Sequence, residues 1–529
     1  MRVRNRAFFL FLFLFSAPVF ASADERRGDA FVTSSIAEPS NLIPFLASDS
    51  ASAEVSRLLF NGLVKYDKNL KLTGDLASDW DIEEGGLVIV FHLRKNVRWQ
   101  DGEPFTARDV AFTFRALTNP SVPTPYGGDF EKVVSLETPD PHTVRVRYKE
   151  PFSPGLASWS VGIVPEHLLK DADWPATGFS RNPVGTGPYK LVQWTSGEKL
   201  VLRANPDYFE GAPFIARVVY RILPEPTTAF LELETENIDS AALSPLQFKR
   251  QTGTPFFKTH YAKYAFPSFS YTYIGYNLRN PLFADKKVRK AIGLAIHKQE
   301  IIDTVLLGYG RAATGPFLAD GWAADPAIGP SGFDPSRAKA LLAEAGWRDT
   351  SGDGILDRGG RRFSFTILTN WGNTDRKMAC EIIQKRLRDV GIEMNIQTLE
   401  WSVLLREFIG KKRFEAVLLG WQLSPEPDPY DIFHSSKTGP GQFNFVSYKN
   451  EEADRLMEEA RRIFPEAERA KIYHRLHGIL SEDEPYTFLY VPESLVALHR
   501  RFKGVEPAPA GIGHNFIEWY VLKNERKYR

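Results

Sequence analysis

The chain has 529 residues, with 66 lysines and arginines against 65 aspartates and glutamates, so its formal net charge at pH 7 is +1. This balance gives no support for a nucleic-acid partner or an anionic-membrane partner. The length exceeds the roughly 250–300 residues that a single hydrophobic core serves, so we expect two or more lobes.

The first 23 residues have the pattern of a cleavable secretory signal. Arg2, Arg4 and Arg6 precede an apolar run at 7–15, and a stretch of small residues ends at Ala23. The apolar run is shorter than the roughly 20 residues that a membrane-spanning helix needs. No cysteine lies shortly after this run, where a lipid would be attached. We therefore expect cleavage after Ala23 and a free periplasmic protein that is not lipid-anchored.

Residues 88–112 carry sharp local signals. The apolar, β-rich run 88–93 predicts a strand, and the Asp-Gly pair at 101–102 predicts a tight turn. Thr106, with Asp109 three residues later, predicts a capping box that opens a helix.

Three later helices are bounded by capping residues, at 285–296, 334–345 and 374–390. Each has an apolar stripe that faces a core, and we assign these stripes no chemistry. The one cysteine, Cys380, cannot form an internal disulfide and lies in the third helix. We expect it to be a small buried side chain rather than a reactive thiol.

Strands are predicted at 363–368, 392–398 and 416–420, separated by the third helix and by a helical stretch near 401–409. A strand, crossover helix, strand order favours parallel pairing and a ligand crevice at the carboxyl ends of the strands. Strand-like and helix-like segments alternate along the chain, which predicts the α/β class.

Five segments resemble, in order, phrases of extracellular solute-binding protein family 5, the oligopeptide and dipeptide receptors of ABC importers. Together they span roughly residues 30–500. The segments are LASDW at 76–80 with 88–112, NPVGTGPYKL at 182–191, NPDYFEG at 205–211, IGYN at 274–277 with VRKAI at 288–292, and FDPSRAKALL at 333–342.

The resemblance implies a fold that periodicity cannot supply: a two-lobed periplasmic binding protein of type II, peptide-binding-protein-like, with an extra inserted domain. The first lobe would comprise 28–62, 161–270 and 488–529. The inserted domain would be 63–160, and the second lobe 271–487.

Motifs of enzymes and metal sites are missing from the sequence or incomplete. There is no GxSxG, HExxH, GxxxxGK[ST] or helix-opening GxGxxG. His474 and His477 are three apart on a charged helix, which favours a solvated face over a metal site. The segment 349–357 starts like a calcium loop, but Gly360 occupies the position of the bidentate carboxylate, which favours a polar turn. We predict no catalysis, no metal site and no cofactor.

The resemblance implies a ligand pocket lined by aromatic residues. Tyr126, Trp401 and Trp421 match pocket positions of the family, and Tyr271 and Tyr273 lie where the chain crosses between lobes. An ordinary core or surface position is the alternative for each. The pattern favours the pocket for the two tryptophans and leaves both interpretations open for the tyrosines.

The polar anchors of the family are not matched. Relatives hold a peptide's α-amino group with an aspartate after the second tryptophan, where this chain has Ser424 by one count and Pro425 by another. Glu426 or Asp428 replaces it only if the loop shifts. A free dipeptide held by its two termini is disfavoured, because burying an unpaired charge costs several kcal/mol.

Two arginines that oligopeptide binders use correspond here to Phe408 and Leu418, which implies an apolar wall. Asn444 offers a donor and an acceptor to a ligand amide. His434 is a possible ligand to a chelated metal, but a turn residue is the favoured interpretation.

The resulting prediction is the periplasmic receptor of a peptide-type ABC importer. It would bind a peptide or peptide-like solute between two closing lobes, act as a monomer and deliver the solute to an inner-membrane permease. A nickel or metallophore receptor of the same family is one alternative. A secreted peptidase and a periplasmic chaperone are alternatives from other classes.

Overall fold

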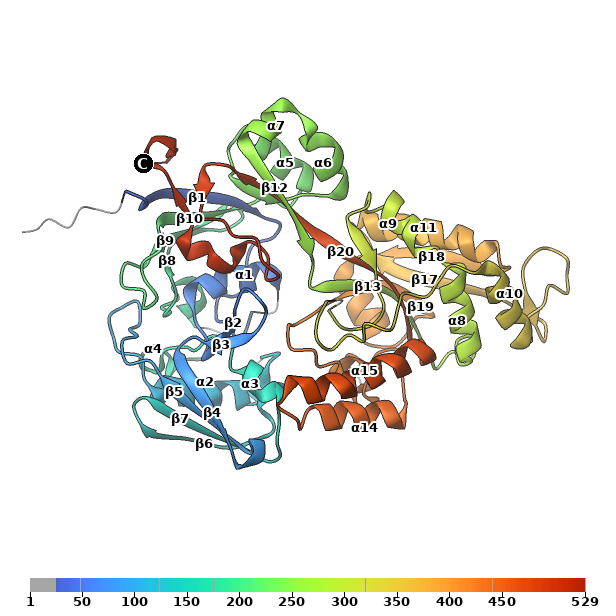
Figure 1. The fold of residues 1–529 in the computed structure, drawn as a ribbon, viewed down its shortest axis with the longest axis horizontal. Coiled ribbons are helices and arrows are strands. Elements are labelled where there is room, and N and C mark those ends of the chain that lie inside the picture. The colour runs from blue at the N-terminus through green and yellow to red at the C-terminus, as the bar shows by residue number, and fades with distance from the viewer. Residues whose placement is uncertain are drawn as a thin grey trace, which may run out of the picture.

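The computed structural model describes residues 25–47, 49–122, 124–174, 177–318, 320–439 and 441–528. The predicted signal at 1–23 lies outside these residues. Within them, no helix combines the length and apolarity needed to cross a membrane. Two lobes lie side by side, with strands passing between them (Figure 1). The predicted two-lobed α/β fold is confirmed.

A twelve-stranded sheet runs through both lobes of the described chain, in the order β18-β17-β19-β13-β20-β11-β1-β10-β9-β8, with β12 and β14 also paired to β20. Strand β20 (Tyr486–His499) joins the lobes: its first half pairs with β13 (Ser270–Tyr276) and β14 (Gly310–Ala312), and its second half with β11 (Ser240–Ala242) and β12 (Tyr261–Pro267). The expected lobe boundaries at 270–271 and 487–488 fall on these crossing strands.

The first lobe is built around β1, which pairs in parallel with β10 and β11. Its core is continuous with that of the inserted domain. Its further elements are β1 (Gly28–Ser35), α1 (Ser50–Leu59), β8 (Tyr189–Thr195), β9 (Lys199–Ala204), β10 (Ile215–Ile222), α5 (Pro226–Glu234), α6 (Pro245–Arg250), α7 (Pro255–His260), β21 (Phe502–Lys503) and β22 (Tyr520–Val521).

The segment expected as the inserted domain contains a four-stranded antiparallel sheet, β4-β5-β7-β6. The predicted strand is β5, and the predicted capping box opens α2: the Thr106 backbone N–H donates to Asp109 Oδ2 at 2.9 Å. The elements are β2 (Val64–Tyr66), β3 (Leu72–Gly74), β4 (Ala77–Glu83), β5 (Val88–Leu93), α2 (Ala107–Thr118), β6 (Val133–Asp140), β7 (Thr143–Tyr148) and α3 (Pro154–Ser158), followed by α4 (Glu166–Leu169).

In the second lobe, β17 pairs in parallel with both β18 and β19, as predicted. The three predicted helices are α8, α10 and α11. The elements are α8 (Lys286–Ala295), α9 (Lys298–Thr304), α10 (Pro335–Glu344), β15 (Asp357–Arg358), β16 (Arg361–Arg362), β17 (Ser364–Asn370), α11 (Thr374–Arg388), β18 (Glu393–Leu399), α12 (Trp401–Val403), β19 (Ala416–Gln422), α13 (Tyr430–Phe433), α14 (Glu451–Ala460) and α15 (Glu466–Asp483).

Cys380 is fully buried in the core beneath α11, as predicted. Burial raises the pKa of its thiol to about 12, so the thiolate does not form at neutral pH. The segment 349–357 is a polar turn, as predicted: the Asp349 carboxylate accepts hydrogen bonds from the backbone N–H groups of Gly352 and Gly354.

The predicted solvated face of α15 is wrong for His477, which is fully buried. Its Nδ1 accepts a hydrogen bond from the Asp325 backbone N–H at 3.1 Å, and its Nε2 donates to the Thr314 carbonyl at 3.0 Å. His474 Nε2 likewise contacts the Trp322 carbonyl at 3.2 Å. Thr314, Trp322 and Asp325 thus contact this face of the helix, and burial lowers the pKa of His477.

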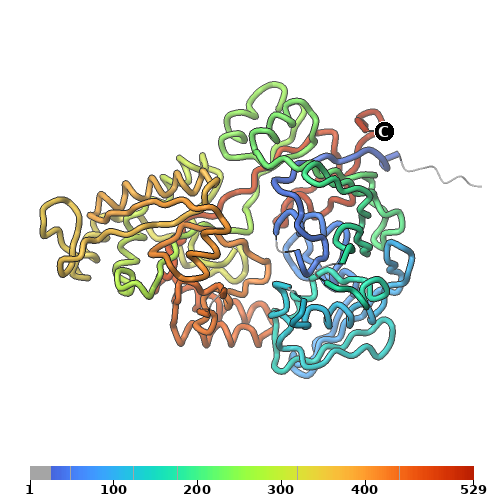
Figure 2. The backbone as a smooth tube through the Cα atoms, turned by 180° about the vertical axis from the view of Figure 1, so that it is seen from behind, coloured from blue at the N-terminus to red at the C-terminus, as the bar shows by residue number. Residues whose placement is uncertain are grey.

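The second lobe also contacts the inserted domain, away from the crossing strands. The Ser153 backbone N–H donates to the Arg461 carbonyl at 2.7 Å, and Arg462 forms an ion pair with Glu150 at 3.1 Å. Phe464 packs against Gly86. The view from behind shows the same adjacency of the two parts (Figure 2). The lobes are therefore joined by crossing strands on one side and by a surface contact on another.

Candidate ligand-binding site

Tryptophans occupy the carboxyl ends of three neighbouring strands. Trp371 directly follows β17, Trp401 follows β18 by two residues, and Trp421 is the penultimate residue of β19. Because β18 and β19 both run parallel to β17, these strand ends lie at the same edge of the sheet. The Trp371 backbone N–H donates to the Leu399 carbonyl at 2.6 Å, which ties two of the ends together.

The side chains of Trp371 and Trp401 are 76% and 46% exposed, unusually high for tryptophan. Trp371 was not among the residues that the sequence motifs indicate. The signal for it in the sequence is its place three residues after the strand predicted at 363–368, which enters a parallel sheet. Ligands of open α/β sheets bind at this edge, so the three tryptophans mark the candidate site.

The Trp421 ring is held by a stack of core tyrosines. It lies parallel to the Tyr273 ring at a centroid distance of 6.4 Å, and Tyr273 stacks on Tyr486 at 4.0 Å. The Trp421 Nε1–H donates to the Tyr486 hydroxyl at 3.3 Å. Tyr273 and Tyr486 are buried, whereas Trp421 is half-buried. Tyr273 thus supports the site from the core, and Trp421 presents a fixed aromatic surface.

Tyr271 lies beside Trp421 across the β13–β19 ladder and is 1% exposed. Its ring packs against Tyr273 and Phe488. Among the described residues, its hydroxyl has no hydrogen-bond partner. The hydroxyl is shielded from solvent in this structure, and a buried hydroxyl without a partner is costly, so a ligand atom that reached it would gain a hydrogen bond.

The acidic side chains after Trp421 have partners within the second lobe. Glu426 forms an ion pair with Arg469, and Asp428 forms one with Arg461 at 2.8 Å. Burial raises the pKa of Glu426, an effect that Arg469 opposes. The exposed Ser424 accepts a hydrogen bond from the Glu426 backbone N–H at 3.2 Å. A ligand ammonium would have to compete with an arginine for either carboxylate.

Asn444 does not reach the crevice in this structure, contrary to expectation. It is fully buried. Its Nδ2 donates to the carbonyls of His434 and Tyr448 at 3.0 and 2.9 Å, and its Oδ1 accepts from the Tyr448 backbone N–H at 2.9 Å. Its amide therefore fixes the local chain. His434 caps a short turn by accepting from the Ser436 backbone N–H, which is the turn role we favoured.

The expected apolar wall is only partly present. Leu418 is fully buried, because its side chain points to the α11 face of the sheet while Trp421 points to the other face. Phe408 is partly buried in the cluster that supports Trp421. Leu418 therefore belongs to the core, and a charge at this position would not lie in the crevice of this structure.

Tyr126 lies on the inserted domain, where its hydroxyl donates to the Ala47 carbonyl at 3.3 Å. Asp129, three residues later, is near Asp428 and Asp431 of the second lobe. Burial, together with these two carboxylates, raises the pKa of Asp129 to about 6. The inserted domain thus faces the loop that follows Trp421, and the expected residues Tyr126 and Asp428 come from opposite sides of that contact.

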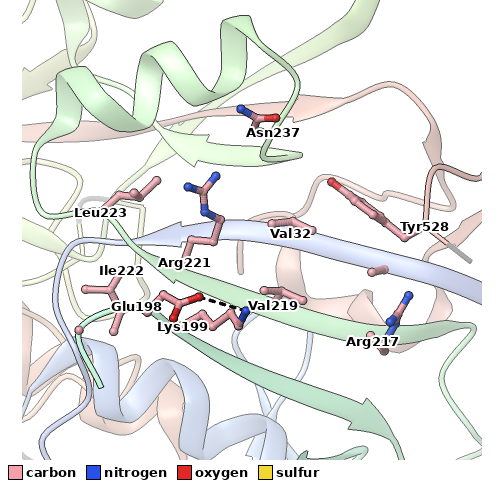
Figure 3. Close-up of a pocket in the computed structure, with 12 residues that line it drawn as sticks. Val32, Glu198, Lys199, Arg217, Val219, Arg221, Ile222, Leu223, Asn237 and Tyr528 are labelled. Carbon is pink, nitrogen blue, oxygen red and sulfur yellow. Dashed lines mark ion pairs between the residues drawn. The ribbon is translucent and has the colours of Figure 1, made fainter. Parts of the chain in front are cut away.

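A cavity of about 450 Å³ lies elsewhere, on the first lobe over β1, β9 and β10 (Figure 3). None of the expected ligand contacts lines it. Two of its basic side chains are paired, Lys199 with Glu198 at 3.1 Å and Arg221 with Glu232 at 2.6 Å. We therefore place the candidate site at the tryptophan edge of the second lobe.

Residues 71–444 match the family described as "Bacterial extracellular solute-binding proteins, family 5 Middle". The chain is 35% identical over 517 residues to the oligopeptide-binding protein AppA of Bacillus subtilis, covering 96% of this chain and 94% of AppA. It is 28% identical to the probable D,D-dipeptide-binding periplasmic protein DdpA of Escherichia coli, covering 90% and 91% of the two chains.

Solved structures show the same fold over nearly the whole chain. The structure of Bacillus subtilis AppA in complex with a nonapeptide superposes with a TM-score of 0.81 at 34% identity and covers 94% of this chain and 99% of that one. NikZ from Campylobacter jejuni in complex with Ni(L-His) gives a TM-score of 0.82 at 28% identity and covers 93% and 99%.

Proposed function

Because the chain belongs to the bacterial extracellular solute-binding proteins of family 5, we propose that it is the substrate-binding component of a peptide-type ABC importer. The resemblance carried by the five sequence segments is confirmed by the family match. The similar proteins are substrate-binding proteins of transport systems, and two of them are named for binding oligopeptides or D,D-dipeptides. The ligand of this chain is accordingly a peptide or peptide-like solute.

The row of Trp371, Trp401 and Trp421 at one sheet edge is the observation that carries this proposal. Aromatic faces bind extended chains of varied sequence through area and stacking, with little need for a particular side chain. The inserted domain faces the same loop region from the other side. A solute between these surfaces would contact both lobes and favour their approach.

Several finer features belong to the same proposal. We propose that the protein is periplasmic, is released by cleavage after Ala23 without a lipid anchor and acts as a monomer. It delivers its solute unchanged to an inner-membrane permease, while partner subunits hydrolyse ATP. The amino-terminal sequence pattern supports the cleavage, and the likeness to a protein named periplasmic supports the location.

The test is to purify the protein without denaturation, release any bound molecule and identify it by mass spectrometry. A set of peptides, reproducibly recovered in amounts near equimolar to the protein, is the expected result. Recovery of a metal chelate or a sugar would reject the peptide as solute. Cleavage of added peptides during prolonged incubation would instead indicate a peptidase.

A nickel chelate is the second candidate, since the similar NikZ was solved with Ni(L-His). Adding nickel with histidine should leave the melting temperature unchanged if the solute is a peptide. A saturable rise that needs both components would favour the chelate instead.

A further inference from the structure

Arg376 lies in the first turn of α11, immediately behind the edge that carries the tryptophans. Its Nη1–H donates to Asn370 Oδ1 at 2.8 Å, and Asn370 is the last residue of β17. Its Nη2 lies against the backbone of β19 at Gly420, where an added Cβ would be 2.8 Å away. A side chain at position 420 would therefore collide with the guanidinium, which lies between the ends of β17 and β19.

The charge of Arg376 is not balanced by a carboxylate. No acidic side chain of the described residues forms an ion pair with it. The groups that influence its electrostatics are Tyr490, Tyr273 and the neutral Cys380. Burial lowers the pKa of the guanidinium, yet arginine stays protonated at any physiological pH. A half-buried cation among neutral groups is an unfavourable arrangement unless an anion joins it.

Asp375, the neighbour of Arg376 in the chain, is not among the groups that influence the electrostatics of Arg376. The carboxylates of the loop after Trp421 are paired with other cations. Glu426 and Asp428 have arginine partners, and Asp431 has Lys437 at 2.9 Å. The tryptophan edge is thus left with a positive charge that the protein itself does not neutralise. A carboxylate suits such a guanidinium because two parallel N–H···O bonds fit its planar geometry.

We propose that Arg376 binds a carboxylate of the bound solute, which makes the second lobe selective for peptides with a free C-terminus or an acidic side chain. This rests on the proposed peptide-binding function. Arg376 then supplies, from α11, the charged anchor that the chain lacks at Phe408 and Leu418. The solute carboxylate would lie beside the ends of β17 and β19, next to Asn370 and Gly420.

The experiment compares capture from a pool of short synthetic peptides of mixed sequence, each made as the free acid and as the C-terminal amide. Captured peptides are counted by mass spectrometry for wild type, Arg376→Gln and the matched control Lys377→Gln. Lys377 is the next residue, and its side chain is 61% exposed. Wild type and Lys377→Gln should prefer free acids by about tenfold or more, and Arg376→Gln should lose that preference.

If wild type instead enriches peptides rich in Asp and Glu regardless of the C-terminus, and Arg376→Gln loses this enrichment, the carboxylate comes from a side chain. Equal capture of acids and amides by wild type without acidic enrichment would overturn the proposal, as would an Arg376→Gln variant with unchanged preference. Capture of no peptide by any of the proteins would overturn the proposed function as well.

Arg376→Lys keeps the test decisive if the glutamine variant does not fold. Lysine retains the charge but not the planar pair of donors, so the preference should shrink without vanishing. Melting curves identify the folded variants. A folded Arg376→Lys protein with the full wild-type preference would contradict a bidentate contact.

Discussion

At the scale of single residues, the site combines aromatic surfaces with charges that are mostly satisfied inside the protein. Trp421 is fixed by Tyr273 and Tyr486, whereas Trp371 is largely exposed and Trp401 about half exposed. Rigid aromatic side chains lose little conformational entropy on binding. Affinity for a solute should therefore depend on these rings more than on the acidic loop after Trp421.

Replacing Trp401 or Trp371 with alanine should weaken peptide binding about tenfold each, since truncating a stacked aromatic group commonly costs 1–2 kcal/mol. Isothermal titration with a captured peptide measures the change. Trp80→Ala, on β4 of the inserted domain, serves as the control and should bind as wild type does. Unchanged affinity in both site variants would reject the pocket as we place it.

The variant Tyr271→Phe shows whether the Tyr271 hydroxyl contacts the ligand or serves only in the core. Removing a buried hydroxyl that lacks a partner should leave the ligand-free protein as stable as wild type, or more stable by about 1 kcal/mol. The same change should weaken peptide binding by about the value of one hydrogen bond, roughly 1 kcal/mol. Melting curves measure the stability of the ligand-free protein, and titrations measure its affinity for the peptide. A destabilised protein with normal affinity would assign Tyr271 to the core alone.

At the scale of elements, the predicted strands and helices were largely confirmed because their signals are local. Capping residues, glycine stops and apolar periodicity define α8, α10 and α11, and the crossover helix makes β17 and β18 parallel. Such patterns do not show which side chains distant segments cover. His477, Asn444 and Leu418 differed from expectation for this reason, since their burial comes from tertiary packing.

The site was only partly predictable. Trp401 and Trp421 carry recognisable neighbours in the sequence, but Trp371 and Arg376 become notable only when the sheet brings three strand ends together. Charge balance is also a tertiary property. The sequence shows Glu426 and Asp428 after Trp421, yet their partners Arg469 and Arg461 lie more than thirty residues later, on or next to α14 and α15.

The carboxyl-terminal segment is tied to β1 by a buried charge cluster. Arg501 forms ion pairs with Asp29 and with Asp239, the latter at 2.8 Å, and the backbone N–H of Tyr528 donates to Asp29. Arg501→Met would leave two carboxylates buried without their cation. We expect the free energy of unfolding to fall by about 3–5 kcal/mol.

Urea denaturation of Arg501→Met measures this loss, with the neighbouring exposed residue changed in Arg500→Met as the control. The control should stay within about 0.5 kcal/mol of wild type. Equal stability of both variants would show that the charge cluster contributes no net stability.

At the scale of the whole molecule, the lobes meet at the crossing strands and at the contact between α14 and the inserted domain. The second contact brings Asp129 near Asp428 and Asp431, whose own partners are Arg461 and Lys437. The approach of the lobes therefore places a third carboxylate beside two others. Protonation of Asp129 relieves this repulsion, so the contact is linked to pH.

The direction of the pH dependence follows from the raised pKa of Asp129. Asp129 titrates at about 6 when the lobes are in contact, above the 3.8 of a free aspartate, so contact takes up a proton. Solute binding that draws the lobes together should strengthen as pH falls from about 7.5 to about 5.5. Asp129→Asn should bind at the higher pH as wild type does at the lower one. A wild-type affinity that weakens toward acid would contradict this linkage.

Hydrogen–deuterium exchange with and without a saturating peptide tests whether the solute is held between the two lobes at the tryptophan edge. Peptide bound there should slow exchange at 370–376, 400–409 and 420–424 of the second lobe, and at 124–130 of the inserted domain. Protection confined to one side, or confined to the cavity over β1 and β10, would contradict it.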